Sequence, residues 1–278
     1  MSRALVLGGG GVAGISWMVG VLTGLRDEGV DVSDADLVVG TSAGSVAGAL
    51  LLSAAGEMYA RQVDPALHAD EIFASVDLDE MATRFGAAVA GASSEEELRA
   101  AIGSMAMEAE TVPEPVRRAV IASRLPVTTW PEALRVTTVD ATTGELVVLD
   151  GRSGFDLVDC VAASCAVPGI WPPVTLGERR CIDGGVRTTL NADLAAGAAA
   201  VLVLAPMGVA GSGPLTAGLD DALPQLGRVV ALEPSEEARA AIGANPLDPA
   251  TRAPAAEAGR RQGVAVAGRV GELWGVAG

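Results

Sequence analysis

The chain has 278 residues, half of them hydrophobic, and carries a formal net charge of −16. This length and the mean hydropathy of +0.39 allow one large α/β domain with a sizeable core. The acidic balance argues against nucleic-acid binding and against electrostatic docking to anionic lipid. No apolar run approaches the ~18–20 residues of a membrane span. The N-terminus reads as a first strand and not as a signal peptide, which predicts a cytoplasmic location.

The first 60 residues alternate between buried-type strands and helices. Arg3–Leu7 reads as a strand, and apolar residues at helical spacing predict a helix over 15–25. Leu37–Val39 is the next strand, and an Ala/Leu-rich helix follows from residue 45 to about 60. This order predicts the beginning of a mostly parallel sheet with crossover helices.

Residues 62–130 form a helical, acidic region with two possible roles. Within 95–108, Leu98, Ile102 and Met105 share one helix face. The region is either a helical layer packed on the sheet or a cap over an apolar substrate groove. The candidates for the lining of such a cap are Phe73, Met81, Phe85, Met105 and Met107.

The second half of the chain predicts further strands and a helical tail. A hairpin is expected over 135–149, a short helix over 157–163 and a proline-rich loop over 164–174. Strands are expected at 180–182, 199–205 and 228–232, and two helices around a break at 245–249. We see no linker that would divide the chain into two domains.

The sequence Gly40-Thr41-Ser42-Ala43-Gly44 lies between a predicted strand and a predicted helix. Small residues on both sides of Ser42 allow a strained turn that presents the hydroxyl beside the N–H groups of a helix N-terminus. Ser42 is therefore a candidate nucleophile. An ordinary glycine-rich turn is the alternative, because Gly, Ser and Ala are common in this chain.

A serine nucleophile needs a neighbouring proton acceptor. The chain has a single histidine, His68, which lies in a polar segment. A histidine triad in the α/β-hydrolase order would need a histidine farther downstream, and the chain has none there. A carboxylate must then act as the base. Asp183 is the best candidate because it ends an apolar strand and precedes Gly184 and Gly185, although Asp-Gly is also a common turn signal. Asp140 and Asp150 also end strand-like runs, but turn residues follow both.

The glycine cluster Gly8–Gly11 follows the first strand and offers consecutive backbone N–H groups for an oxyanion. The same region satisfies a dinucleotide fingerprint, Gly9-x-Gly11-x-x-Gly14. That fingerprint requires an acidic residue at the end of the second strand, where this chain has the turn at Ser42. The missing acidic residue and the turn at Ser42 therefore favour a hydrolase over a dinucleotide-binding protein.

Together these motifs resemble the patatin-like phospholipase family. The family has a glycine-rich oxyanion loop, a G-x-S-x-G turn and a D-G-[GA] motif, which match Gly8–Gly11, Gly40–Gly44 and Asp183–Gly185 in the same order. Residues 164–173 also resemble its S-x-A-x-P…P-P loop. The match covers about residues 3–193. The chain departs from the family at Ala13, where the glycine loop usually carries Arg or Lys.

The resemblance implies a three-layer α/β/α fold with a mostly parallel sheet, as a single domain over 1–278 whose C-terminal strand and helices cover about 199–278. It implies a serine esterase or lipid acyl hydrolase that needs no metal or cofactor. Ser42 would be the nucleophile and Asp183 the general base. The oxyanion would be held by N–H groups of Gly9, Gly10, Gly11 and Ala43. A non-catalytic lipid-binding relative is the alternative. The natural acyl ester, membrane contact and oligomeric state stay open.

Overall fold

The computed structural model of the chain describes residues 2–68, 71–73, 83, 86, 92–210 and 218–276. These residues contain an eight-stranded sheet with the order β5-β6-β3-β2-β1-β7-β8, in which β4 pairs with β3. The strands are β1 (Arg3–Leu7), β2 (Leu37–Thr41), β3 (Leu134–Asp140), β4 (Leu146–Leu149), β5 (Val174–Leu176), β6 (Arg179–Asp183), β7 (Ala200–Leu204) and β8 (Arg228–Leu232).

The centre of the sheet is parallel and one end is antiparallel. β2 and β7 both pair in parallel with β1, β3 pairs in parallel with β2, and β8 pairs in parallel with β7. β4 and β6 run antiparallel to β3, and β5 runs antiparallel to β6. The predicted mostly parallel sheet is confirmed, and the predicted hairpin over 135–149 is the β3–β4 pair.

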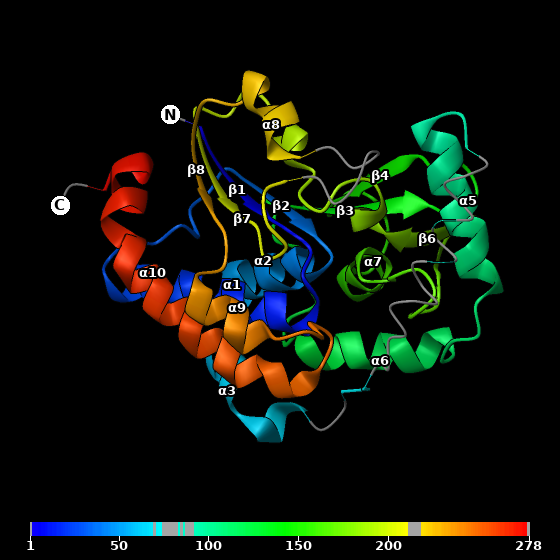
Figure 1. The fold of residues 1–278 in the computed structure, drawn as a ribbon, viewed down its shortest axis with the longest axis horizontal. Helices are drawn as coiled ribbons and strands as arrows, with labels where there is room; N and C mark the ends of the chain where they lie inside the picture. Colours follow the sequence, from blue (N-terminus) through cyan, green and yellow to red (C-terminus); the bar gives the residue numbers. More distant parts are fainter. Residues whose placement is uncertain are drawn as a thin grey trace.

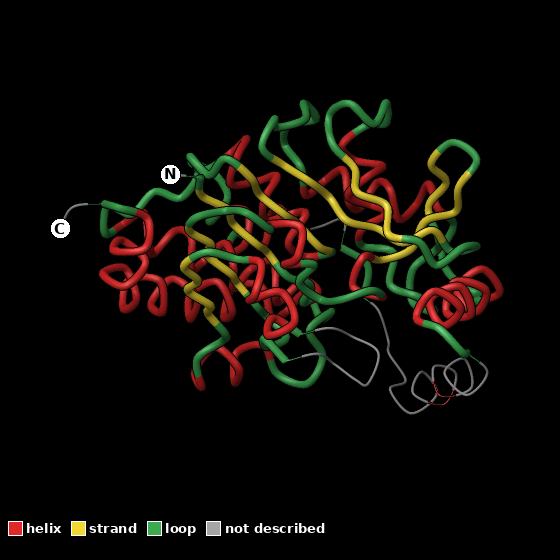
Figure 2. Tube along the Cα trace, turned by 90° about the horizontal axis from the view of Figure 1, so that it is seen from above, coloured by secondary structure: helices red, strands yellow, loops and turns green. Residues whose placement is uncertain are grey.

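Helices cover both faces of this sheet, which gives three layers (Figures 1 and 2). The helices are α1 (Gly11–Asp27), α2 (Ala43–Ala54), α3 (Ala60–Val63), α5 (Glu95–Glu108), α6 (Glu114–Arg124), α7 (Leu157–Ser164), α8 (Leu219–Ala222), α9 (Glu236–Ile242) and α10 (Arg252–Trp274). Alternate residues of β1 show the two faces, because side chains alternate along a strand. Leu5 and Leu7 pack in a core with α1, α2, α7 and α10, whereas Ala4 and Val6 pack with α8 and the turn Ala192–Ala195.

The first and last long helices lie side by side with their backbones in close contact (Figure 1). A Cβ placed on Gly20 of α1 would lie 2.1 Å from the Ala256 carbonyl oxygen, and one on Gly259 of α10 would lie 2.3 Å from the Trp17 carbonyl oxygen. Only glycine fits at these positions. The C-terminal helix is therefore part of the same core as the N-terminal strands.

Helix α5 forms a layer on the sheet, as the first of the two interpretations of residues 62–130 expects. Leu98 and Ile102 pack with Val139 of β3 and Ile182 of β6. Three of the cap candidates can be placed: Phe73 and Met107 are exposed, and Met105 is packed against α5's own cluster. Met81 and Phe85 lie outside the described residues. Among the helices that the structure describes, none combines the length and hydropathy needed to cross a bilayer.

Candidate active site

Ser42 stands at the turn between β2 and α2. Its φ of 51° and ψ of −115° lie where residues with side chains are rarely found. A Cβ on Gly44 would lie 1.9 Å from the Leu7 carbonyl oxygen, and one on Gly40 would lie 2.6 Å from the Cα of Ser45. These two glycines let α2 begin directly against β1 and β2, which forces the tight turn at Ser42.

Two other serines hold this turn from either side. The Ser42 backbone N–H donates a hydrogen bond to the Oγ of Ser164, at the end of α7, over 2.8 Å. The Ser45 hydroxyl donates to the Ser42 carbonyl oxygen over 2.6 Å. All three serines are buried or nearly so. The strained backbone is therefore fixed by specific bonds, and the Ser42 side chain has one defined direction.

The sheet register brings Asp183 to Ser42, although many residues separate them in the sequence. Thr41 of β2 pairs with Thr137 of β3, and the next residue of β3, Thr138, pairs with Asp183 at the end of β6. The Asp183 N–H donates to the Ala166 carbonyl oxygen over 3.0 Å. The last residues of two strands on either side of β3 thus face the same point.

The Asp183 carboxyl group is buried, accepts a hydrogen bond from the Gly185 N–H and interacts with the Ser42 side chain. Burial raises the pKa of Asp183 to about 6. This effect outweighs the interactions with the Ser42 side chain and the Gly185 N–H, which lower the pKa. The Gly185 bond to Oδ1 measures 2.7 Å. At neutral pH this aspartate is ionised, yet it holds a proton more strongly than an aspartate in water does. Such a carboxylate is suited to accept a proton from a serine.

The two other aspartates that end strand-like segments have turn roles instead. Asp140 Oδ1 accepts the N–H of Thr142 over 2.9 Å, and Asp150 Oδ1 accepts the N–H of Arg152 over 2.9 Å. These bonds are typical of turns in which an aspartate side chain mimics the backbone.

The glycine loop lies beside Ser42, but its N–H groups are not equivalent. The Gly9 N–H donates to the Thr189 carbonyl oxygen over 2.8 Å. The expectation that Gly9 donates to an oxyanion therefore needs correction, because this hydrogen already has an acceptor inside the protein. Within the described part of the chain, the N–H groups of Gly10, Gly11 and Ala43 have no such acceptor. Gly11 and Ala43 also line the pocket at Ser42.

Other chain segments pack closely against the same loop. The Ala13 N–H at the start of α1 donates to the Pro246 carbonyl oxygen over 2.9 Å. A Cβ on Gly11 would lie 2.6 Å from that oxygen, and one on Gly10 would lie 2.5 Å from the Cβ of Pro206. One N–H group at the start of α1 is therefore already bonded within the chain, which does not favour the dinucleotide alternative. Over the described residues, no group of three His, Cys, Asp or Glu side chains is arranged to hold a metal ion.

Asn191 is a central residue of the site that no sequence motif singles out. It is fully buried and has a φ of 49°. Its side-chain NH₂ group, which has two hydrogens, lies within hydrogen-bond distance of four oxygens: Thr41 Oγ1 at 3.0 Å, Thr137 Oγ1 at 3.3 Å, and the carbonyl oxygens of Gly184 and Thr188 at 3.3 and 2.9 Å. One side chain therefore joins the strand before Ser42 to the turn after Asp183.

A narrow pocket opens at Ser42 and is mostly apolar. Its lining comprises Gly11, Val12, Ile15, Ser42, Ala43, Ile72, Arg117, Arg124, Cys165, Val167, Trp171 and Leu247. Its free volume of about 20 Å³ is close to that needed by one water molecule. An acyl group can enter only if lining side chains move apart. The two arginines are unexpected in this lining, because the sequence offered no motif that contains them.

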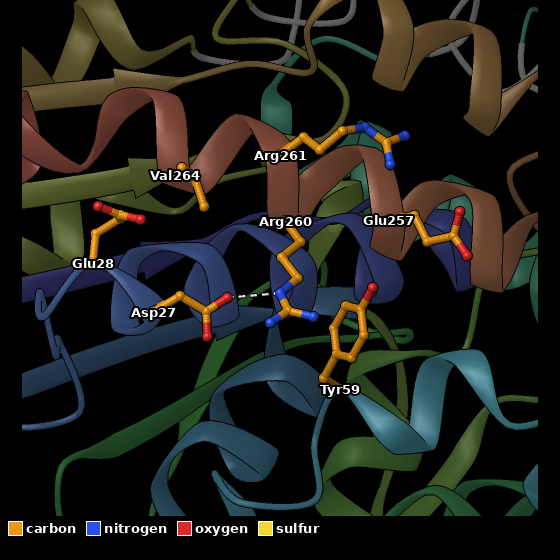
Figure 3. Close-up of a pocket in the computed structure, with 7 residues that line it drawn as sticks. All are labelled: Asp27, Glu28, Tyr59, Glu257, Arg260, Arg261 and Val264. Carbon is orange, nitrogen blue, oxygen red and sulfur yellow. Dashed lines mark hydrogen bonds and ion pairs between the residues drawn. The ribbon is translucent and has the colours of Figure 1, made fainter.

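A larger pocket of about 600 Å³ lies elsewhere on the surface, between α1, α10 and the segment before α3 (Figure 3). It is lined by Asp27, Glu28, Tyr59, Glu257, Arg260, Arg261 and Val264. Arg260 forms an ion pair with Asp27 over 2.6 Å and lies over the Tyr59 ring. Both of its arginines are already paired, Arg260 with Asp27 and Arg261 with Glu237. The pocket contains none of the candidate site residues, so the site at Ser42 is the better candidate for chemistry.

Comparisons with known proteins indicate the family of this chain. A family model described as patatin-like phospholipase matches residues 5–196. Among solved structures, the chain is similar to VipD from Legionella pneumophila, with 13% identity, a TM-score of 0.48, and coverage of 96% of this chain and 66% of that one. It is also similar to the type III effector protein ExoU, with 16% identity, a TM-score of 0.40, and coverage of 98% of this chain and 53% of that one. The chain thus spans less than two thirds of either protein. A search of curated proteins gives no match.

Proposed function

The chain belongs to the patatin-like phospholipase family, and we propose that it is a lipid acyl hydrolase that cleaves carboxylic esters through a dyad of Ser42 and Asp183. The observation that carries this proposal is the buried carboxyl group of Asp183, which the sheet register brings to Ser42 and which interacts with the Ser42 side chain at a raised pKa. The strained backbone at Ser42 supports it as well, because strain of this kind gathers at nucleophiles. His68 is the only histidine of the chain, so no histidine occupies the downstream position that the base of a histidine triad has in α/β-hydrolases.

In the proposed reaction, Asp183 takes the hydroxyl proton while Ser42 Oγ attacks the ester carbonyl carbon. The carbonyl oxygen becomes an oxyanion, which the N–H groups of Gly10, Gly11 and Ala43 would bind. This role is supported by the lack of an acceptor for these three groups among the described residues, and by Gly11 and Ala43 in the pocket lining. The C–O bond to the alcohol then breaks, and the alcohol leaves with the proton from Asp183. An acyl group remains on Ser42.

The second half of the reaction repeats the first with water. Asp183 takes a proton from water, and the resulting hydroxide oxygen attacks the acyl carbonyl carbon. The bond to Ser42 Oγ breaks, Ser42 recovers its proton from Asp183, and the carboxylic acid leaves. A carboxylate with a pKa of about 6 can both accept and return this proton near neutral pH.

We also propose that residues 1–278 act as one domain. The family match ends at residue 196, yet Leu247 lines the pocket and the Pro246 carbonyl oxygen accepts the Ala13 N–H. The C-terminal part therefore contributes directly to the shape of the proposed site.

A fluorophosphonate probe tests the nucleophile. Wild type should be labelled on the peptide that contains Ser42, and Ser42→Ala should not be labelled. Ser53→Ala is the matched control, because it makes the same change near the end of the same helix, away from the pocket. Purified wild type should also hydrolyse p-nitrophenyl butyrate, and Ser42→Ala should lose about 10³-fold or more of this rate. Equal labelling of wild type and Ser42→Ala would refute the assignment, and labelling without turnover would favour a lipid-binding protein.

A further inference from the structure

Arg117 is a buried cation whose N–H groups are not satisfied. It lies on α6 with 4% of its surface exposed, and its guanidinium stacks on the Trp171 ring at 3.8 Å from the ring centre. Its Nε and Nη1 are buried, and among the described residues neither has a hydrogen-bond acceptor. Stacking on a ring satisfies the face of a guanidinium, whereas its N–H groups point outward in the plane and still need acceptors. A native structure rarely leaves such groups unpaired without a functional reason.

The neighbouring charges compensate Arg117 only in part, because the charge of Glu71 acts on it without a direct ion pair. Glu71 is also buried, but it pairs with Arg124, which donates to it from Nε over 2.9 Å and from Nη2 over 2.6 Å. Glu71 also accepts from Arg252, which donates in addition to the Gln62 side chain over 2.9 Å. One carboxylate thus serves two arginines. The group has an excess of positive charge inside a chain whose net charge is −16.

Arg117 stays charged at neutral pH despite this environment. Burial, and then the positive charge of Arg124, lower its pKa to about 9. A buried cation without a directly paired anion is unfavourable for folding, and its cost is relieved when an anion binds next to it.

The position of Arg117 shows where such an anion would lie. Arg117 lines the same narrow pocket as Ser42 and Ala43, and apolar side chains such as Val167 form much of the remaining lining. A ligand that places an ester carbonyl at Ser42 therefore brings its adjacent atoms toward the guanidinium. A ligand with a negative group next to the ester would supply the missing acceptors.

We propose that Arg117 forms an anion subsite that binds the phosphodiester of a glycerophospholipid whose acyl ester lies at Ser42. This inference rests on the proposed function and names the substrate group that the pocket selects. Only a few bonds separate the ester and the phosphodiester in such a lipid, and guanidinium groups bind phosphate oxygens strongly. A neutral ester leaves the Arg117 N–H groups unpaired in a closed pocket, and buried polar groups without partners discriminate strongly against such a ligand.

The test compares two soluble esters with the same acyl chains, dihexanoylphosphatidylcholine below its micelle concentration and dihexanoylglycerol. Monomeric substrates avoid the repulsion between an acidic protein and an anionic bilayer. In Arg117→Met, which keeps an apolar stem against Trp171, the ratio of kcat/KM for the phospholipid to that for the diacylglycerol should fall about 10- to 100-fold. Arg117→Lys should recover part of the ratio. Arg269→Gln removes an exposed charge from α10 and should leave the ratio unchanged. Equal losses on both esters in Arg117→Met would overturn the proposal.

A competition experiment separates a lipid headgroup from free phosphate as the bound group. Glycerophosphocholine should inhibit wild-type hydrolysis of p-nitrophenyl butyrate competitively, and at least tenfold more weakly in Arg117→Met. Inorganic phosphate that inhibits as well as glycerophosphocholine would overturn the headgroup assignment. If wild type hydrolyses neither ester, the proposed function fails, and calorimetry with glycerophosphocholine then decides the subsite alone. A Kd at least tenfold weaker in Arg117→Met would support it, and equal Kd values would overturn it.

Discussion

Replacing Asp183 with Asn should abolish ester hydrolysis and at the same time stabilise the folded protein at pH 8. Asp183 has 5% of its surface exposed, and its Oδ1 accepts the Gly185 N–H. An asparagine has the shape of a protonated aspartate, so its Oδ1 keeps this bond and its Nδ2 can donate to Ser42. The variant therefore removes the charge and the proton acceptor while the packing stays the same.

The magnitude follows from the pKa of Asp183, which burial raises from 3.8 to about 6. The folded state holds this proton more tightly than the unfolded chain does. The stability contributed by the group is therefore fully present below about pH 4 and is lost as the pH rises through about 6. A shift of about two units at 1.36 kcal/mol each corresponds to about 3 kcal/mol. Because Asn cannot ionise, we expect Asp183→Asn to gain about 1–3 kcal/mol over wild type at pH 8, and nothing below pH 4.

Urea unfolding of wild type and Asp183→Asn at pH 8 and pH 4, together with p-nitrophenyl butyrate turnover, measures both effects. Asp140→Asn is the matched control. Asp140 is also buried at a strand end, but it accepts the N–H groups of two turn residues and pairs with Arg179 over 3.5 Å. That control should lose stability at pH 8. The reasoning would be refuted if Asp183→Asn were less stable than wild type at pH 8, or if it gained as much at pH 4.

Three further predictions follow from the same contacts. The kcat/KM for p-nitrophenyl butyrate should rise with pH through about 6 and then level off, because only ionised Asp183 can take the Ser42 proton; a profile that is flat between pH 5 and 8 would contradict this role. Asn191→Leu should lower the free energy of unfolding by about 2–4 kcal/mol and kcat at least tenfold, because it removes the NH₂ group that lies within hydrogen-bond distance of four oxygens around the site; urea unfolding and turnover that both stay at wild-type values would count against it. Gly184→Ala should cost about 2–4 kcal/mol, since the new Cβ would lie 2.5 Å from the Thr137 carbonyl oxygen. Gly268→Ala, on α10 with nothing within 4 Å, should instead gain about 0.5–1 kcal/mol; thermal unfolding of the two variants should therefore move in opposite directions.

Elements with strong periodicity could be predicted from the sequence. β1 and β8 have the predicted bounds, and α5 covers the 95–108 segment whose apolar face was recognised. The short elements β5 and α8 were not predicted, because three or four residues beside prolines or glycines carry no periodic signal. Helix α2 ends at Ala54 and not near residue 60, because a turn that includes Gly56 follows it.

Only those residues of the site that belong to local sequence motifs could be predicted. Ser42 and Asp183 stand out because each follows an apolar strand and is flanked by glycines. That they meet depends on the register of β3 with both of its neighbours, which no local pattern contains. Asn191 and Arg117 gave no signal at all, since single polar residues of these types most often lie on the surface. Their roles follow from burial, which only the fold shows.

Three unfavourable features meet around one pocket of the described structure. Ser42 has a positive φ, Asp183 has a buried carboxyl group with a raised pKa, and Arg117 has buried N–H groups without acceptors. Features of this kind cost about 1–3 kcal/mol each. Selection for stability alone would replace these three residues, because a single substitution relieves each unfavourable feature.

By contrast, the buried amides of Gln62 and Asn191 are engaged in hydrogen bonds that join neighbouring elements. Unfavourable groups that gather at one place are expected where a protein binds and transforms a ligand. The three features also differ in what they would need: Ser42 an electrophile, Asp183 a proton, and Arg117 an anion. An acyl ester with an adjacent phosphodiester supplies all three in one molecule.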